Sequence, residues 1–180
     1  NALIVAHART GATVARLKGG DPAIFGRLDE EIAALEAAGI GHAVVPGITT
    51  ASAAAAAIGQ SLTQRGRNSS FRVLTGHDVD GFAEQDWRAL ARPGATAAIY
   101  MGVKAARFIG GRLLMHGAAA DTPVTAVENV SRPDQRVIAT NLIDLSRALG
   151  EPNADRPVVI LYGLEPRAAT VALSEVKEAL

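Results

Sequence analysis

The chain has 180 residues, 48% of them apolar, and its 18 basic and 18 acidic residues give a formal net charge of zero. This balance is typical of one globular domain or two small ones, and it excludes wholesale disorder. Lys and Arg do not cluster, so no nucleic-acid partner is expected. The chain has no cysteine, and its four histidines are too far apart for metal-ligand spacing, so no metal site is expected.

Strand-like and helix-like segments alternate along the chain, which predicts an α/β fold. In the first sixty residues the expected helices cover residues 1–9, 29–38 and 49–58, and the expected strands cover 13–17 and 43–45. Gly11 and Gly39 are placed to end the first two helices, and Thr49 or Thr50 is placed to cap the third. The opening apolar run is too short to span a membrane, so we expect a cytoplasmic protein with no membrane partner.

A polar stretch over residues 60–70 is the expected boundary between two domains, 1–60 and 61–180. In the second domain the expected strands cover residues 71–75, 96–101, 124–128, 136–140 and 157–162, and the expected helices cover 84–91, 103–116 and 141–149. The short turn at Pro133-Asp134 predicts that the strands on either side of it form an antiparallel hairpin. The second domain is therefore predicted to hold a mixed sheet flanked by helices.

Two glycine-bearing turns are the strongest local signals for a ligand site. Residues 19–22 read Gly-Gly-Asp-Pro after a strand-like run, and residues 44–50 read VVPGITT before a helix. Adjacent glycines let a backbone approach a ligand closely, and Asp21 can either accept hydrogen bonds from that ligand or brace the turn. If the two preceding strands are neighbours, both turns lie at the carboxyl end of one sheet, where α/β folds bind ligands.

Six segments occur in an order that resembles the uroporphyrinogen-III C-methyltransferases, including the methyltransferase half of siroheme synthase. They are LKGGDPAIFGR, VVPGITTASAAAAAIG, SLTQRG, LTGH, YMG and VEN. The resemblance implies a tetrapyrrole methylase fold of two α/β domains, with S-adenosylmethionine in the cleft between them and with uroporphyrinogen III as substrate. It also implies a homodimer.

The resemblance carries over to individual residues. The positions that it assigns to the cofactor are Gly19, Gly20, Asp21, Ile24, Thr49, Thr50, Met101, Val130 and Val158. It assigns Arg27 and Arg65 to the substrate, whose carboxylates suit bidentate arginine contacts, and Glu30 to a place near the substrate where it assists proton transfer. The three form the expected catalytic set.

Some features depart from the family pattern. The family's opening strand, its Gly/Pro loop, and the Asp and Lys of its proton transfers do not occur here, so we expect this chain to be part of a longer protein whose first domain is incomplete. Gln64 replaces a histidine, Leu28 a glycine and Val130 a glycine that could require positive φ. These departures leave two alternatives open: a methyltransferase acting on a later precorrin of the cobalamin pathway, or a catalytically inactive binding module.

Overall fold

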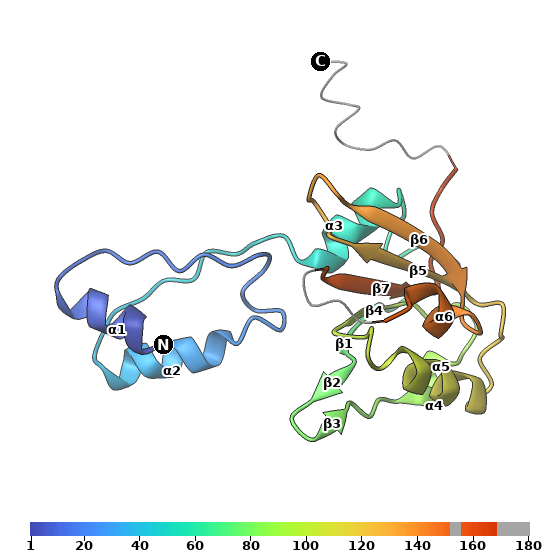
Figure 1. Cartoon of the computed structure of the whole chain (residues 1–180), viewed down its shortest axis with the longest axis horizontal. Helices are drawn as coiled ribbons and strands as arrows, with labels where there is room; N and C mark the ends of the chain where they lie inside the picture. Colours follow the sequence, from blue (N-terminus) through green and yellow to red (C-terminus); the bar gives the residue numbers. More distant parts are fainter. Residues whose placement is uncertain (152–155, 169–180) are drawn as a thin grey trace, which may run out of the picture. The chain divides into compact units, whose positions relative to one another are not determined.

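The computed structural model describes residues 1–151 and 156–168. These fall into two compact units, Asn1–Thr50 and Ala51–Leu180, whose elements are labelled in Figure 1. The domain limits predicted at residues 60 and 61 stay a prediction. No helix of the described residues combines the length and apolar content needed to cross a membrane.

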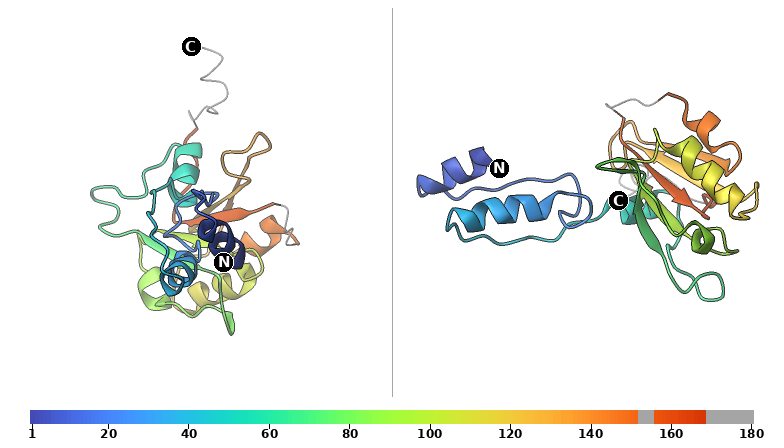
Figure 2. Two further views of the ribbon diagram at one scale, coloured as in Figure 1. Left: turned by 90° about the vertical axis from the view of Figure 1, so that its left-hand side faces the viewer. Right: turned by 90° about the horizontal axis from the view of Figure 1, so that it is seen from below.

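The first unit contains two helices, α1 (Ala2–Arg9) and α2 (Leu28–Ala37), which lie side by side in Figures 1 and 2. Both predicted helices are confirmed. Three acids occupy the first turn of α2, where the positive end of the helix dipole favours them. The helix ends at Ala37, and Gly39, just beyond its cap, has a φ of 68° that suits glycine and an amide that donates to the Glu36 carbonyl over 3.0 Å.

The strands predicted over residues 13–17 and 43–45 are wrong. Both segments are without regular secondary structure, and no ladder of hydrogen bonds pairs either of them with a neighbour. A strand requires a partner about 4.8 Å away, and β-rich composition alone does not supply one. Leu17 and Val45, which would pack beneath a sheet, are instead 81% and 80% exposed.

The second unit is built on a five-stranded mixed sheet of order β1-β4-β7-β5-β6. Its strands are β1 (Arg72–Thr75), β4 (Ala97–Tyr100), β5 (Pro123–Glu128), β6 (Arg136–Asn141) and β7 (Val158–Tyr162). Only β1 and β4 pair in parallel; β4–β7, β7–β5 and β5–β6 pair antiparallel. The predicted mixed sheet and the predicted β5–β6 hairpin are both confirmed.

Helices cover both faces of this sheet. On one face, α5 (Ala106–Met115) and α6 (Leu145–Leu149) pack through Leu113 and Leu145 against Ile160, and α4 (Trp87–Leu90) joins the same core through Leu90. On the other, α3 (Thr50–Ala57) packs through Ala54 against Val159 and its neighbours. Adjacent residues of β7 therefore enter opposite cores, which explains why that strand is apolar throughout rather than alternating.

A short hairpin of β2 (His77–Asp78) and β3 (Gly81–Phe82) was not predicted. Each strand has two residues, too few for a hydrophobic period to appear in the sequence. Side-chain packing holds the hairpin in place: the Phe82 ring lies 5.0 Å from that of His77 and 5.2 Å from that of Phe108 in α5.

Candidate functional site

The two glycine-bearing turns of the first unit come together although neither follows a strand. One carboxylate joins them: Asp21 Oδ1 accepts from the Ala23 amide over 2.8 Å, and Oδ2 accepts from the Gly47 amide over 3.2 Å. The backbones are also in close contact, since a Cβ at Gly47 would lie 2.6 Å from the Gly20 carbonyl oxygen. Of the two roles considered for Asp21, the structure shows the brace.

The predicted cofactor residues of this unit lie in and around the joined turns. Gly19 is exposed, with no other group within 4 Å of the space that a Cβ would fill, so its backbone is open to a ligand. The Thr50 hydroxyl lies 3.7 Å from the corresponding position at Gly20. Ile24 is half-buried, and its amide donates to the Asp21 carbonyl over 3.3 Å. Thr49, also half-buried, directly precedes α3.

Arg27 and Glu30 form a bidentate ion pair at the start of α2. Arg27 Nε donates to Glu30 Oε1 over 2.8 Å, and Nη2 donates to Oε2 over 2.5 Å. The hydrogen bond from Arg27 lowers the pKa of Glu30, and its counterpart raises the pKa of Arg27. Both side chains are largely exposed. At neutral pH Glu30 is therefore a carboxylate, able to accept a proton but not to donate one.

Lys18 was missed by the sequence reasoning. Its ammonium donates to the Gly26 carbonyl over 2.5 Å and pairs with Glu31 over 2.8 Å, while Arg16 pairs with the same carboxylate over 3.1 Å. The hydrogen bond from Lys18 is the main cause of the lowered pKa of Glu31; the bond from Arg16 lowers this pKa further, whereas burial opposes the shift. Lys18 thus ties both ends of the segment 18–26 to α2. No local motif signals this contact, because its partners are eight and thirteen residues away.

In the second unit, the predicted cofactor residues Met101, Val130 and Val158 lie at the same end of the interior strands β4, β5 and β7. Strands β4 and β5 both run antiparallel to β7, so the carboxyl ends of those two strands meet the start of β7. Glu128 pairs with Val158 in register, and the Asn129 amide donates to the Pro157 carbonyl over 2.9 Å. The structure therefore brings these three residues to the same end of the sheet.

Residues with positive φ occur at the same end of the sheet. Met101, with φ of 52°, follows β4, and Asn129 and Ser131, with φ of 52° and 66°, follow β5. Val130 is not among the residues with positive φ, so the loop accommodates a β-branched side chain there by placing the left-handed conformations on either side of it.

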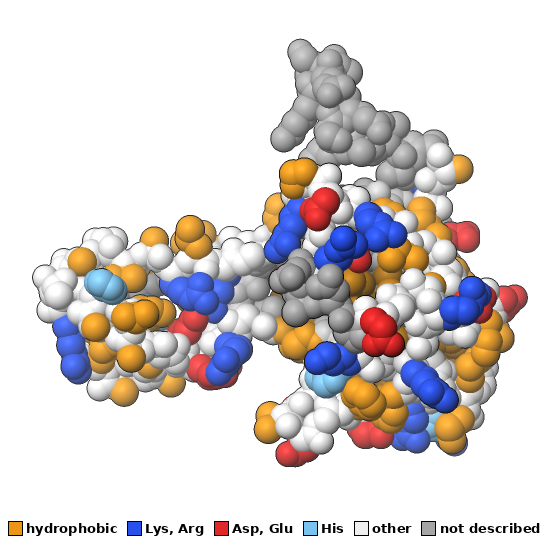
Figure 3. All heavy atoms as spheres, viewed as in Figure 1, with side chains coloured by type: hydrophobic (Ala, Val, Ile, Leu, Met, Phe, Trp, Pro, Cys, Tyr) orange, Lys and Arg blue, Asp and Glu red, His pale blue; other side chains and the backbone are white. Residues whose placement is uncertain are grey.

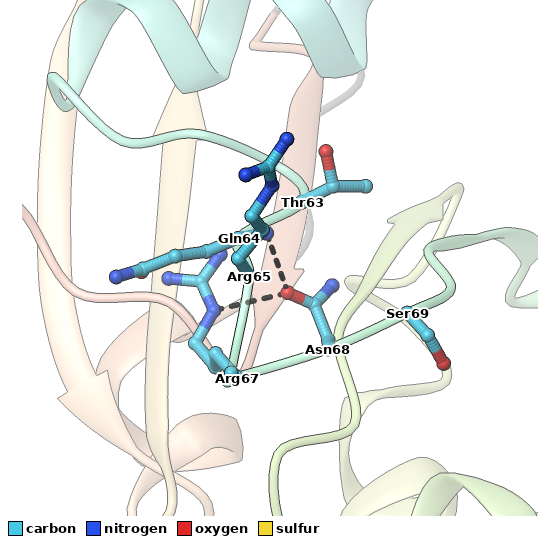
Figure 4. Close-up of a pocket in the computed structure, with 7 residues that line it drawn as sticks. Thr63, Gln64, Arg65, Arg67, Asn68 and Ser69 are labelled. Atoms are coloured by element: carbon cyan, nitrogen blue, oxygen red, sulfur yellow. Dashed lines mark hydrogen bonds between the residues drawn. The ribbon is translucent and has the colours of Figure 1, made fainter.

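Arg65 lies in a polar loop that forms a hollow of about 600 Å³ (Figure 4). The hollow is lined by residues 63–69. Asn68 organises the loop: its Oδ1 accepts from the Gln64 amide over 3.0 Å, and its Nδ2 donates to Thr96 Oγ1 over 2.6 Å. Arg67 donates to the Ser61 carbonyl over 2.6 Å. Among the described residues, none bonds the Arg65 guanidinium, which leaves it available for an external anion.

A histidine, aspartate or glutamate cluster that could hold a metal is absent from the described part of the chain, and cysteine is absent from the sequence. The first unit offers interlocked glycine turns. The second unit offers Arg65 in a polar hollow and Met101, Val130 and Val158 at one end of its sheet. Residues of these kinds are typical of α/β proteins that bind organic ligands with acidic groups.

Comparison with known proteins names the family. Residues 1–146 match the Tetrapyrrole (Corrin/Porphyrin) Methylases, and the chain belongs to this family. It is 48% identical to siroheme synthase of Gluconacetobacter diazotrophicus over 91% of its own length and 35% of that protein. It is 44% identical to uroporphyrinogen-III C-methyltransferase of Paracoccus denitrificans over 91% of its length and 57% of that protein.

A solved structure agrees with the fold. The Thermus thermophilus uroporphyrin-III C-methyl transferase, complexed with S-adenyl homocysteine, is 34% identical and superposes with a TM-score of 0.75. The match covers 90% of this chain and 70% of that one. The predicted fold class is thus confirmed, and the chain spans about a third to a little over half the length of the curated relatives above.

Proposed function

We propose that the protein containing this chain methylates uroporphyrinogen III at ring carbons, with S-adenosylmethionine as methyl donor, to give precorrin-2. The observation that carries the proposal is the pair of turns joined by Asp21, within a chain 44% identical to a uroporphyrinogen-III C-methyltransferase. The alternative substrate, a later precorrin, is an outcome of the test below.

The residues present suit the cofactor. The open backbone at Gly19 and the polar groups around Gly20 and Thr50 offer hydrogen bonds, and Met101, 53% exposed, offers an apolar surface to a sulfonium methyl group. We propose that these residues, with Asp21, Ile24, Thr49, Val130 and Val158, bind S-adenosylmethionine. When bound, it supplies an electrophilic methyl group.

The substrate's negative charge suits the arginines. Arg65, whose guanidinium is unbonded among the described residues, can bind a propionate or acetate side chain of the tetrapyrrole by a bidentate contact. Arg27 can do the same only by sharing or exchanging its contact with Glu30. Each methylation forms a carbon–carbon bond, breaks a carbon–sulfur bond and releases one proton, which the ionised Glu30 is chemically able to accept.

We also propose that the protein acts in the cytoplasm as a homodimer. Figure 3 shows apolar side chains gathered on the surface of the first unit, and Leu17, Val45 and Ile48 are 73–81% exposed there. Multi-angle light scattering of the full-length protein tests the dimer, and a monomer at micromolar concentration would contradict it.

The experiment is calorimetric titration of the full-length protein with S-adenosylhomocysteine, followed by anaerobic methyl-transfer assays with uroporphyrinogen III. Binding and turnover support the proposal. Failure of a folded protein to bind S-adenosylhomocysteine contradicts the cofactor, and turnover only of a later precorrin contradicts the substrate.

Arg65→Ala tests the substrate site. We expect the KM for the tetrapyrrole to rise about tenfold, because a hydrogen-bonded charge pair is lost, and the Kd for S-adenosylhomocysteine to stay within about twofold. Arg107→Ala, at an exposed position of α5, is the matched control and should change neither. Equal KM values in Arg65→Ala and wild type would remove Arg65 from the substrate site.

A further inference from the structure

The carboxyl ends of β1 and β4 are joined backbone to backbone. The Gly76 amide donates to the Tyr100 carbonyl over 2.7 Å. A Cβ at Gly76 would lie 2.7 Å from both the Met101 carbonyl oxygen and the Gly102 Cα. Only glycine fits this position, and the close approach brings the next residue, His77, beside the turn that ends β4.

The His77 ring bonds the backbone of that turn. Its Nδ1 lies 3.1 Å from the Met101 carbonyl oxygen. A carbonyl oxygen only accepts, so Nδ1 is the protonated ring nitrogen and donates this bond. Met101 has a φ of 52°, a left-handed conformation that residues other than glycine adopt at an energetic cost and keep only where their surroundings hold it.

His77 is held both at its backbone and at its ring. Thr75 Oγ1 donates to the His77 carbonyl over 2.7 Å and lies 3.3 Å from the His77 amide, which fixes the backbone as it enters the β2–β3 hairpin. On the other side, the His77 ring meets Phe82 edge-on, and Phe82 packs on Phe108, which in turn meets the buried Trp87 at 5.7 Å. The hairpin thus holds the half-buried imidazole against the Met101 carbonyl at the surface of the unit, with Phe82 linking it to Phe108 and the buried Trp87.

We propose that His77 is a positioning residue for the cofactor site. It holds the Met101 peptide in its left-handed conformation and so sets the direction of the exposed Met101 side chain at the end of β4. The effect passes through the Met101 carbonyl; His77 itself need not touch a ligand. The inference rests on the proposed function, because Met101 is a cofactor contact only if S-adenosylmethionine binds.

Three variants of the full-length protein test the proposal. His77→Phe keeps an aromatic ring against Phe82 but removes the donor. His77→Asn places an amide nitrogen near the position of Nδ1 and keeps the donor. His116→Phe makes the same change at an exposed histidine after α5 and is the control.

Calorimetry with S-adenosylhomocysteine should give a Kd about tenfold higher for His77→Phe, within about threefold of wild type for His77→Asn, and unchanged for His116→Phe. Hydrogen exchange of the peptide spanning residues 99–104 should be faster in His77→Phe alone. A general loss of packing would not be rescued by asparagine, so the rescue separates positioning from stability.

The outcomes that would contradict the positioning role differ from the outcome that would contradict the proposed function. If wild type binds and His77→Phe binds equally well, the positioning role is wrong while the proposed cofactor stands. If His77→Phe and His77→Asn are equally impaired, the donated hydrogen bond is not the cause and the inference is overturned. If folded wild type does not bind, the proposed function fails and this inference fails with it.

Discussion

At the scale of single residues, Asp21 is the contact on which the glycine turns depend. Its two oxygens accept from the amides of Ala23 and Gly47, twenty-four residues apart in sequence. A carboxylate that accepts two backbone amides stabilises both turns, and its removal leaves two donors to find water instead.

We therefore expect Asp21→Ala to raise the Kd for S-adenosylhomocysteine about tenfold and Asp21→Asn to have a smaller effect, because the amide oxygen keeps one of the two bonds. Calorimetry on the full-length protein measures both. Asp121→Ala, at an exposed position of the second unit, is the control. Equal affinity in Asp21→Ala and wild type would show that the site lies elsewhere.

A second prediction at this scale concerns the pKa of Glu30. Its pKa is lowered chiefly by the hydrogen bond from Arg27, so Arg27→Gln should raise the pKa of Glu30 toward the ordinary glutamate value. Because the folded-state pKa is the lower one, the pair favours folding above the unfolded pKa, and this contribution is lost as pH falls through the folded value. Carboxyl NMR titration measures the shift.

The control for this titration is Glu84 in the second unit, whose pKa is lowered by Trp87 and Arg112 and should not change in Arg27→Gln. An unchanged Glu30 would mean that the exposed ion pair does not persist in solution, as many exposed pairs do not.

At the scale of elements, β7 supports the second unit from its centre. Ile160 is fully buried against α5 and α6, and its neighbours Val159 and Leu161 enter the opposite core. We expect Ile160→Val to lower the free energy of unfolding by about 0.5–1.5 kcal/mol and Ile160→Ala by about 2–5 kcal/mol, from lost transfer energy and the cavity left behind.

Urea unfolding followed by the fluorescence of Trp87, the single tryptophan, measures these changes. Val137→Ala, at a 41% exposed position of the edge strand β6, should cost less than about 1 kcal/mol. Similar losses at Ile160 and Val137 would contradict the central role of β7.

The strand predictions succeeded and failed for the same physical reason. Residues 97–100 and 158–162 became β4 and β7 because each has a partner on both sides and helices over both faces. Residues 13–17 and 43–45 have comparable β-rich composition but no partner, and they form no ladder. A β-rich composition favours a strand, but the strand forms only where a neighbouring strand pairs with it.

At the scale of the whole molecule, the two units differ in how much they bury. Pro22 is the only buried residue among residues 1–50, whereas Ile58, Leu113, Leu164 and many others are buried in the second unit. Backbone amides exchange with solvent by local opening where few apolar contacts hold the chain.

We therefore expect hydrogen exchange to be fast across residues 1–50 and slow in β4, β5 and β7 of this chain. S-adenosylhomocysteine should slow exchange around residues 18–22 and 46–50, because binding favours the ordered turns. Equal protection of both units without ligand would contradict the prediction.

The sequence by itself determined the family, the α/β class, the second unit's sheet with its β5–β6 hairpin, and the two turns as the place to look for a ligand. These follow from short local patterns: glycine and proline at turns, apolar runs of strand length, and motifs in a fixed order. Only the tertiary structure decided that Asp21 braces the turns, that Lys18 reaches Glu31, that positive φ falls at Asn129 rather than Val130, and that His77 bonds Met101. Each of these depends on groups brought together by folding or on a backbone conformation set by packing, and neither leaves a period or a spacing in the sequence.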